Sequence, residues 1–176
     1  MADRVADIES HPLAWALARV RTQTLALVAD VPDDAMRAQS LYGERHPAWI
    51  LGHVLLSDAY LLFLLESRPL DDRFHALLSR YGPSAPPRGD ATYDERETIV
   101  DELRATNERR VAIVRMMSAD DLARPLADDF LATAQPTIGH HLHALVAHEG
   151  YHAGQLSTWR RAHGLAPVRW MLGPGA

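Results

Sequence analysis

The chain has 176 residues, 47% of them hydrophobic and 23% charged, with a formal net charge of −5, which is typical of one globular domain with a sizeable core. The acidic balance and the lack of a basic block argue against a nucleic-acid partner. The absence of cysteine excludes disulfides, thiolate metal ligands and a cysteine nucleophile, so the ten histidines are the residues to follow.

The N-terminal segment carries no sign of a targeting sequence. Its first ten residues contain four charged side chains and no apolar run, unlike a secretory signal. The longest apolar run, residues 59–65, has seven residues, whereas a membrane span needs roughly 20. We therefore expect a cytoplasmic protein with no membrane partner.

Two helices are predicted in the first part of the chain. The first covers residues 11–30, where apolar residues recur at helical spacing, with Ser10 placed as its cap and Pro12 in its first turn. The second covers residues 47–66 and is apolar around most of its circumference. Such a helix is either well buried in the domain or leaves room for a homodimer interface.

Two more long helices are predicted in the second part. Residues 92–95 match a capping box, which begins a helix at Thr92 that continues to about Met117. The last helix runs from near Pro136 to Gly164, a natural C′ glycine.

The connection between the second and third helices is long. It contains a short predicted helical turn at 71–80 and a loop rich in Gly and Pro at 82–89; another short turn is predicted at 118–123. A connection of about 25 residues can cross a bundle, so the helices that it joins need not be antiparallel neighbours. We predict one domain over residues 1–176, an all-α four-helix bundle with a long crossover between helices 2 and 3.

The strongest motif lies on the last predicted helix. His148 and His152 are four residues apart, so they share one face with Cβ atoms roughly 5–6 Å apart. Two imidazoles placed this way can converge on one metal ion. A bare pair at this spacing is close to chance in a chain with ten histidines, but Glu149 between them makes the pattern far more specific.

His-Glu-x-x-His is also the zincin signature, in which the Glu is the general base of a metalloprotease. That interpretation needs a third ligand, and Gln155 and Thr158 stand where a metzincin would need Gly and His. No Asp or Glu follows Ala153, and His163 lies about 16 Å along the helix from His152. The protease interpretation therefore fails.

The third ligand must come from another helix, and His53 is the best candidate. It lies in an apolar stretch, where a buried histidine needs a partner, and bundle interiors are where facing helices build metal sites. A hydrogen-bonded core histidine explains the spacing equally well. His140, His141 and His143 precede the motif by roughly 7–12 Å along the helix axis, which assigns them surface or packing roles.

The stretches 46–53 and 148–155 together resemble two motifs of the DinB-like (damage-inducible) superfamily. The resemblance implies a four-helix bundle that holds one divalent metal ion, with zinc or nickel expected, on His53, His148 and His152. Characterised relatives include transferases and isomerases that use low-molecular-weight thiols such as mycothiol or bacillithiol. The resemblance therefore implies a metal-dependent transferase that joins such a thiol to a small-molecule substrate.

The chemistry of three histidines is compatible with this activity. Three protein nitrogens leave an open position on a tetrahedral metal, and metal coordination lowers the pKa of a bound thiol. Two other functions stay open at this point. One is a non-catalytic, stress-related module that binds metal, and the other is a metal-dependent hydrolase with Glu149 as its base.

Five residues are expected around the metal ligands. Gln155 and Tyr151 fall near the direction of His148 on a helical wheel, and Gln155 is expected to orient a ligand or touch the substrate, a polar core role being the alternative. Glu149 points roughly 100° away; it could accept a hydrogen bond from a ligand histidine or pair with an arginine, and a structural role is favoured. Tyr60 and Trp49 share the face of His53 and could line the pocket; for Trp49, a core aromatic role is the favoured alternative.

Overall fold

A computed structural model describes residues 11–39, 45–67, 69–85, 93–127 and 129–168. Four long helices dominate it: α2 (Pro12–Ala26), α3 (Pro47–Glu66), α5 (Arg96–Arg115) and α8 (Ile138–Ala162). The shorter elements are η1 (Ala35–Arg37), α4 (Asp72–Tyr81), α6 (Ala119–Ala123) and α7 (Asp129–Ala132). The described residues contain no β-strand, which confirms the predicted all-α class.

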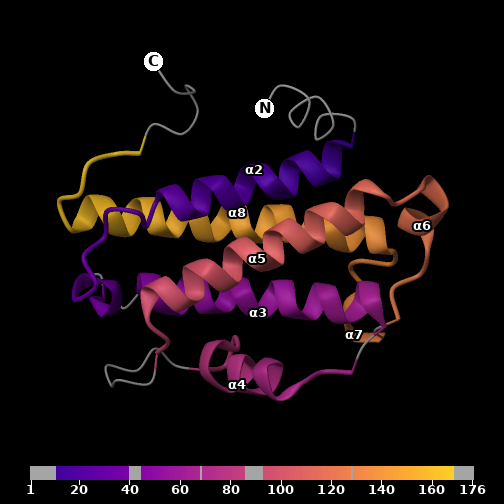
Figure 1. Ribbon diagram of the computed structural model, residues 1–176, viewed down its shortest axis with the longest axis horizontal. Coiled ribbons are helices and arrows are strands. Elements are labelled where there is room, and N and C mark those ends of the chain that lie inside the picture. Colours follow the sequence, from indigo (N-terminus) through magenta and orange to yellow (C-terminus); the bar gives the residue numbers. More distant parts are fainter. Residues whose placement is uncertain (1–10, 40–44, 68, 86–92, 128, 169–176) are drawn as a thin grey trace.

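The four long helices form a bundle in which α2 packs against α8 and α5, and α3 packs against α5 and α8. Figure 1 shows that α3 and α5 run in the same direction, while α2 and α8 run in the opposite one. The chain after α3 returns along the bundle past α4 before α5 begins. The predicted crossover between the second and third long helices is therefore confirmed.

Helix α3 is the centre of the bundle. Thirteen of its twenty residues are buried, because α4, α5 and α8 all pack against it. By length and composition α3 is apolar enough to cross a membrane, with a mean hydropathy of 1.8, but 67% of that apolar window is buried inside the domain. Intramolecular packing thus accounts for most of the apolar circumference, and the homodimer stays a prediction.

The first predicted helix is shorter than expected. Helix α2 ends at Ala26 and not near residue 30, and its N-cap is His11, whose Nδ1 accepts from the Ala14 N–H; Ser10, the predicted cap, lies outside the described residues. The Leu27 carbonyl, which a longer helix would use internally, accepts a hydrogen bond from Arg160 at 2.9 Å. A tertiary contact therefore replaces the last helical turn.

The third predicted helix also begins later than expected. Helix α5 starts at Arg96 and not after Thr92, which lies outside the described residues. Asp94 instead makes tertiary contacts: its N–H donates to the Tyr81 hydroxyl, and its carboxylate accepts from that hydroxyl and from Arg80. These bonds hold residues 93–95 outside the helix, so the capping box predicted there is wrong.

The last helix begins at Ile138, two residues after the predicted start, with Thr137 as its cap. Residues before it are extended because the Pro136 carbonyl accepts from Leu126, and Ile138 donates to the Arg124 carbonyl. The predicted end is confirmed: Gly164 has a φ of +73°, and the Leu165 N–H donates to the Arg160 carbonyl at 3.0 Å. This is a Schellman ending that requires glycine.

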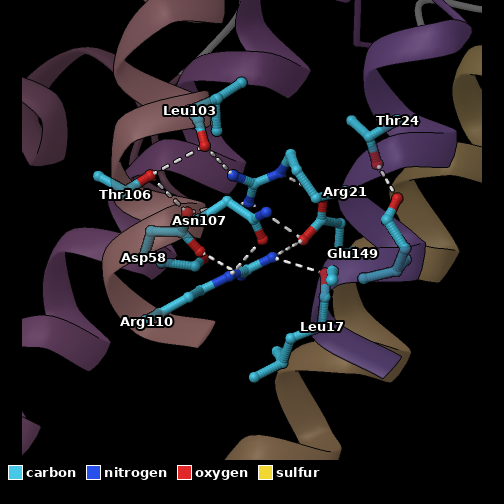
Figure 2. Close-up of polar contacts among 12 residues, drawn as sticks. Leu17, Arg21, Thr24, Asp58, Leu103, Thr106, Asn107, Arg110 and Glu149 are labelled. Carbon is cyan, nitrogen blue, oxygen red and sulfur yellow. Dashed lines mark hydrogen bonds and ion pairs between the residues drawn. The ribbon is translucent and has the colours of Figure 1, made fainter. Parts of the chain in front are cut away.

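A buried ion-pair quartet joins the four long helices. It consists of Arg21 from α2, Asp58 from α3, Arg110 from α5 and Glu149 from α8, each at most 2% exposed. Each guanidinium bonds both carboxylates; the Arg21–Glu149, Arg21–Asp58 and Arg110–Glu149 contacts measure 2.7, 2.9 and 3.0 Å (Figure 2). Burial alone would raise the pKa of the Asp58 carboxyl, but Arg110 and Arg21 hold it below its usual value. The quartet therefore pairs two guanidinium groups with two carboxyl groups, and the arginines favour the ionised form of Asp58.

Candidate metal centre

Three histidine side chains from two helices converge in the bundle. His53 comes from α3, and His148 and His152 come from successive turns of α8. The Nε2 atom of His148 lies 3.2 Å from that of His53 and 3.1 Å from that of His152, and the ligand atoms of all three lie within 4.8 Å of one another. Three nitrogens that meet in this way could hold one metal ion.

The outer nitrogen of two of these rings is held by an oxygen acceptor. His53 Nδ1 lies 2.8 Å from the Tyr81 carbonyl oxygen, and His152 Nδ1 lies 2.7 Å from Gln155 Oε1. Since both oxygens only accept, each Nδ1 donates its proton outward and each Nε2 presents a lone pair to the centre. This is the arrangement that second partners impose on metal-binding histidines.

The Gln155 amide contacts both His152 and Tyr151. Its Oε1 faces His152 Nδ1, and its Nε2 donates to the Tyr151 hydroxyl at 3.0 Å. Tyr151 is 64% exposed and takes part through Gln155. The structure thus places the two predicted neighbours from α8 beside the cluster in the role expected for Gln155, whereas their effect on a bound metal stays a prediction.

Burial keeps the three histidines neutral. Burial lowers the pKa of His53, with a further contribution from His148, and it also lowers the pKa of His148. For His152, burial together with the neighbouring His148 lowers the pKa to about 4. At neutral pH all three rings therefore carry the lone pair that a metal ligand needs.

A cavity of about 460 Å³ adjoins the histidine cluster. His53 and His148 form part of its wall, and Ser57 and Tyr60 continue the wall along α3. The remaining lining is mostly apolar and comes from α3, α4, the turn after α4, α8 and the segment around α7: Leu56, Phe74, Leu78, Pro83, Leu131, Gln135, His141, Ala144 and Leu145. A small molecule in this cavity would contact two of the three clustered histidines.

The neighbours predicted on α3 have different surroundings. Tyr60 lines the cavity, as expected. Trp49 does not: it is 3% exposed, and its ring stacks on His53 with a centroid distance of 4.6 Å and an interplanar angle of 14°. The guanidinium of Arg45 lies 4.1 Å from the centre of the Trp49 ring. Trp49 is therefore a buried aromatic residue that packs against the His53 ring, which is the core role favoured from the sequence, and it does not line this cavity.

Glu149 belongs to the quartet. Its two carboxylate oxygens accept hydrogen bonds from Arg21 and Arg110, and the residue is 2% exposed. Arginine pairing was one of the two possibilities left open by the sequence, and it gives Glu149 the structural role that was favoured. It leaves the carboxylate poorly placed to act as a general base, because its lone pairs point at guanidinium groups, so the expectation that Glu149 neighbours the metal in a pocket role is corrected.

The remaining histidines divide between caps, surface and cavity. His46 is buried and caps α3 by accepting from the Trp49 N–H at 3.2 Å. His140 and His143 are exposed, as expected. His141 is 4% exposed and lines the cavity. This position was not predicted from the sequence, because the spacing of His141 was tested only for a metal ion shared with His148 and His152. The seven-residue interval between His141 and His148 is about two helical turns, so it could have predicted that both residues lie on the same face of α8.

Gly52 next to His53 is required by close packing. A Cβ atom there would lie 2.3 Å from two ring carbons of Tyr81, whose carbonyl holds His53. We expect Gly52→Ala to reduce the free energy of unfolding by about 1–3 kcal/mol through overpacking. At Gly150, where no atom lies within 4 Å, alanine should instead stabilise the helix by roughly 0.5–1 kcal/mol. Urea denaturation of both variants measures this difference, and a neutral Gly52→Ala would contradict it.

The hydrogen bond from His152 to Gln155 gives a prediction about metal affinity. Gln155→Leu removes the acceptor that orients the ring, and we expect the dissociation constant for zinc to rise by roughly 10–100-fold. Gln155→Glu retains an oxygen acceptor and should lose less. Competition with a chromophoric chelator gives both constants; equal affinities in wild type and Gln155→Leu would show that Gln155 has no orienting role.

A known family matches most of the chain. The family model described as the DinB superfamily matches residues 16–156, a range that contains all three clustered histidines. A search of curated proteins found no match to the chain.

Proposed function

The chain belongs to the DinB superfamily, and from this premise we propose that it is a metal-dependent enzyme that transfers a low-molecular-weight thiol to an electrophilic small molecule. The observation that supports the proposal is the meeting of three Nε2 atoms at the wall of a cavity. Packing of the four long helices requires neither the histidine cluster nor the cavity.

The residues present fit a divalent ion. Three neutral imidazoles are a donor set that suits zinc or nickel, and the outward Nδ1 bonds to Tyr81 and Gln155 orient two of them before any ion arrives. His53, His148 and His152 would hold the ion. When bound, it would supply the Lewis acid that lowers the pKa of a small-molecule thiol toward neutrality.

The rest of the chemistry falls to the chain and the substrates. In the overall reaction, the thiol sulfur forms a bond to an electrophilic carbon, the bond from that carbon to an electronegative atom breaks, and the thiol proton ends on that atom. In an epoxide this atom is the ring oxygen, which stays on the product as a hydroxyl. The chain has no cysteine, so the sulfur must come from outside. The apolar cavity wall beside His53 and His148 would exclude water from the reacting atoms.

The two alternatives are less well supported. A hydrolase would need Glu149 as a base, and its carboxylate is bonded to Arg21 and Arg110. A module that only binds metal would not need a cavity of about 460 Å³ next to the ligands. The first observation argues against the hydrolase, and the second argues against a module that only binds metal.

A thiol-consumption assay tests the transferase. Protein reconstituted with zinc or nickel is mixed with mycothiol, bacillithiol or glutathione and a soluble electrophile such as an epoxide, and the free thiol is measured over time. We expect metal-dependent consumption of at least one thiol by wild type and by the exposed-site control His143→Ala. Metal-loaded protein that consumes none of the three thiols would contradict transfer while leaving metal binding intact.

A further inference from the structure

The cavity beside the three histidines has the features of a substrate site of defined chemistry. We propose that it binds an uncharged, largely apolar molecule about 10 Å long, which lies between the histidine cluster at one end and Tyr60 and His141 at the other. This inference rests on the proposed function and names the class of its electrophilic substrate.

The length follows from the register of two helices. Helices α3 and α8 run antiparallel, and they face each other at both ends of the cavity: the rings of His53 and His148 are 5.1 Å apart, and those of Tyr60 and His141 are 6.3 Å apart. Seven residues separate the two ends on each helix. At a rise of 1.5 Å per residue this interval is roughly 10 Å, which sets the length of a molecule that contacts both ends.

The charge of the molecule follows from the lining. Between the two ends the wall consists of Leu56 and Ser57 from α3 and Ala144 and Leu145 from α8, and α4 adds Phe74 and Leu78. No Asp, Glu, Arg or Lys belongs to the lining formed by the described residues. An ionised substrate group would lose its hydration there without a fixed counter-charge, at a large cost in free energy.

The end opposite the cluster offers polar groups that carry no carboxylate, guanidinium or ammonium. His141 Nδ1 lies 2.6 Å from Gln135 Oε1, which anchors both side chains in the cavity wall. Tyr60 adds a phenol on the facing helix. A few polar groups in a mostly apolar cavity orient a ligand without binding a charge, so this end fits a hydroxyl or carbonyl group.

A matched set of probes tests the proposal: 4-phenylbutan-1-ol, 4-phenylbutanoate and protonated 4-phenylbutylamine, which share a body and differ in charge. Isothermal titration is done on zinc-reconstituted and on chelator-treated wild type, because the carboxylate could also bind zinc directly. In the chelator-treated protein we expect the alcohol to bind at least tenfold more tightly than either ion. In the chelator-treated protein, a charged probe that binds as tightly as the alcohol, or no binding by any probe at millimolar concentration, would overturn the proposal.

Two variants connect the binding to this cavity. Ala144→Leu fills the wall midway between the two ends and should weaken binding of the alcohol at least tenfold, whereas Ala147→Leu adds the same bulk at an exposed position of the same helix and should bind it as wild type does. Equal affinities in the two variants would place the alcohol elsewhere. Because the titration needs neither metal nor thiol, failure here is distinct from failure of the transferase assay.

Discussion

Replacement of Glu149 by Gln is expected to lower the free energy of unfolding by about 3–5 kcal/mol, because it removes one member of a buried ion-pair network. Glu149 accepts from Arg21 at 2.7 Å and from Arg110 at 3.0 Å. With Gln in its place, two buried guanidinium groups would share the single charge of Asp58. The effect should appear as a lower urea midpoint, with the dependence on urea unchanged.

The controls for this prediction distinguish the network from a general effect of removing a carboxylate. Glu108 lies on the exposed face of α5. Glu108→Gln should therefore change the free energy of unfolding by no more than about 0.5 kcal/mol. Replacing the whole quartet by apolar residues (Arg21→Met, Asp58→Leu, Arg110→Met and Glu149→Leu) should be far less harmful than the single change, because no charge is left unpaired. A Glu149→Gln variant as stable as wild type would contradict this prediction.

Replacement of His148 by Ala is expected to abolish metal binding. His148 is the central member of the cluster, since its Nε2 lies within 3.2 Å of both other Nε2 atoms. Wild type reconstituted with zinc or nickel should contain near one ion per chain by elemental analysis, and His148→Ala should contain almost none. His143→Ala, which removes an exposed histidine of the same helix, should retain the ion.

Metal binding should also appear in thermal stability. An ion present at 100 times its dissociation constant stabilises the fold by about 2.7 kcal/mol, and each 1 kcal/mol shifts Tm by roughly 2–4 °C in a domain of this size. Wild type should gain this shift with zinc or nickel, and His148→Ala should not. Wild type that remains metal-free after exposure to zinc, nickel and manganese would show that the cluster is not a metal site.

The ends of the helices show where the local sequence does not suffice to predict where a helix begins or ends. The cap of α8 and its Schellman ending depend on Thr137 and Gly164, which act within one turn, and Gly164 was identified from the sequence. The start of α5 depends on Asp94, whose partners Tyr81 and Arg80 lie on α4. Nothing in residues 92–95 indicates those bonds, so the local capping box was the wrong choice.

Some residues of the candidate site were predictable from local sequence, whereas others depend on the packing of the helices. The sequence by itself determined the bundle, the crossover and the pair His148 and His152, because helical period and i,i+4 spacing are properties of neighbouring residues. For His53 it left a ligand and a core histidine equally plausible. Only the antiparallel packing of α3 on α8 brings His53 opposite His148, and only the fold places the Tyr81 carbonyl where it turns the His53 ring inward.

The partners of Glu149 and the formation of the cavity depend on the tertiary structure alone. Arg21 and Arg110 are 128 and 39 residues from Glu149 along the chain, so no local pattern could choose them over a ligand histidine as its partners. The cavity likewise needs α4 and the segment around α7 to close against α3 and α8. Short-range periodicity fixes which residues share a helix face, but contacts across helices depend on how the whole chain packs.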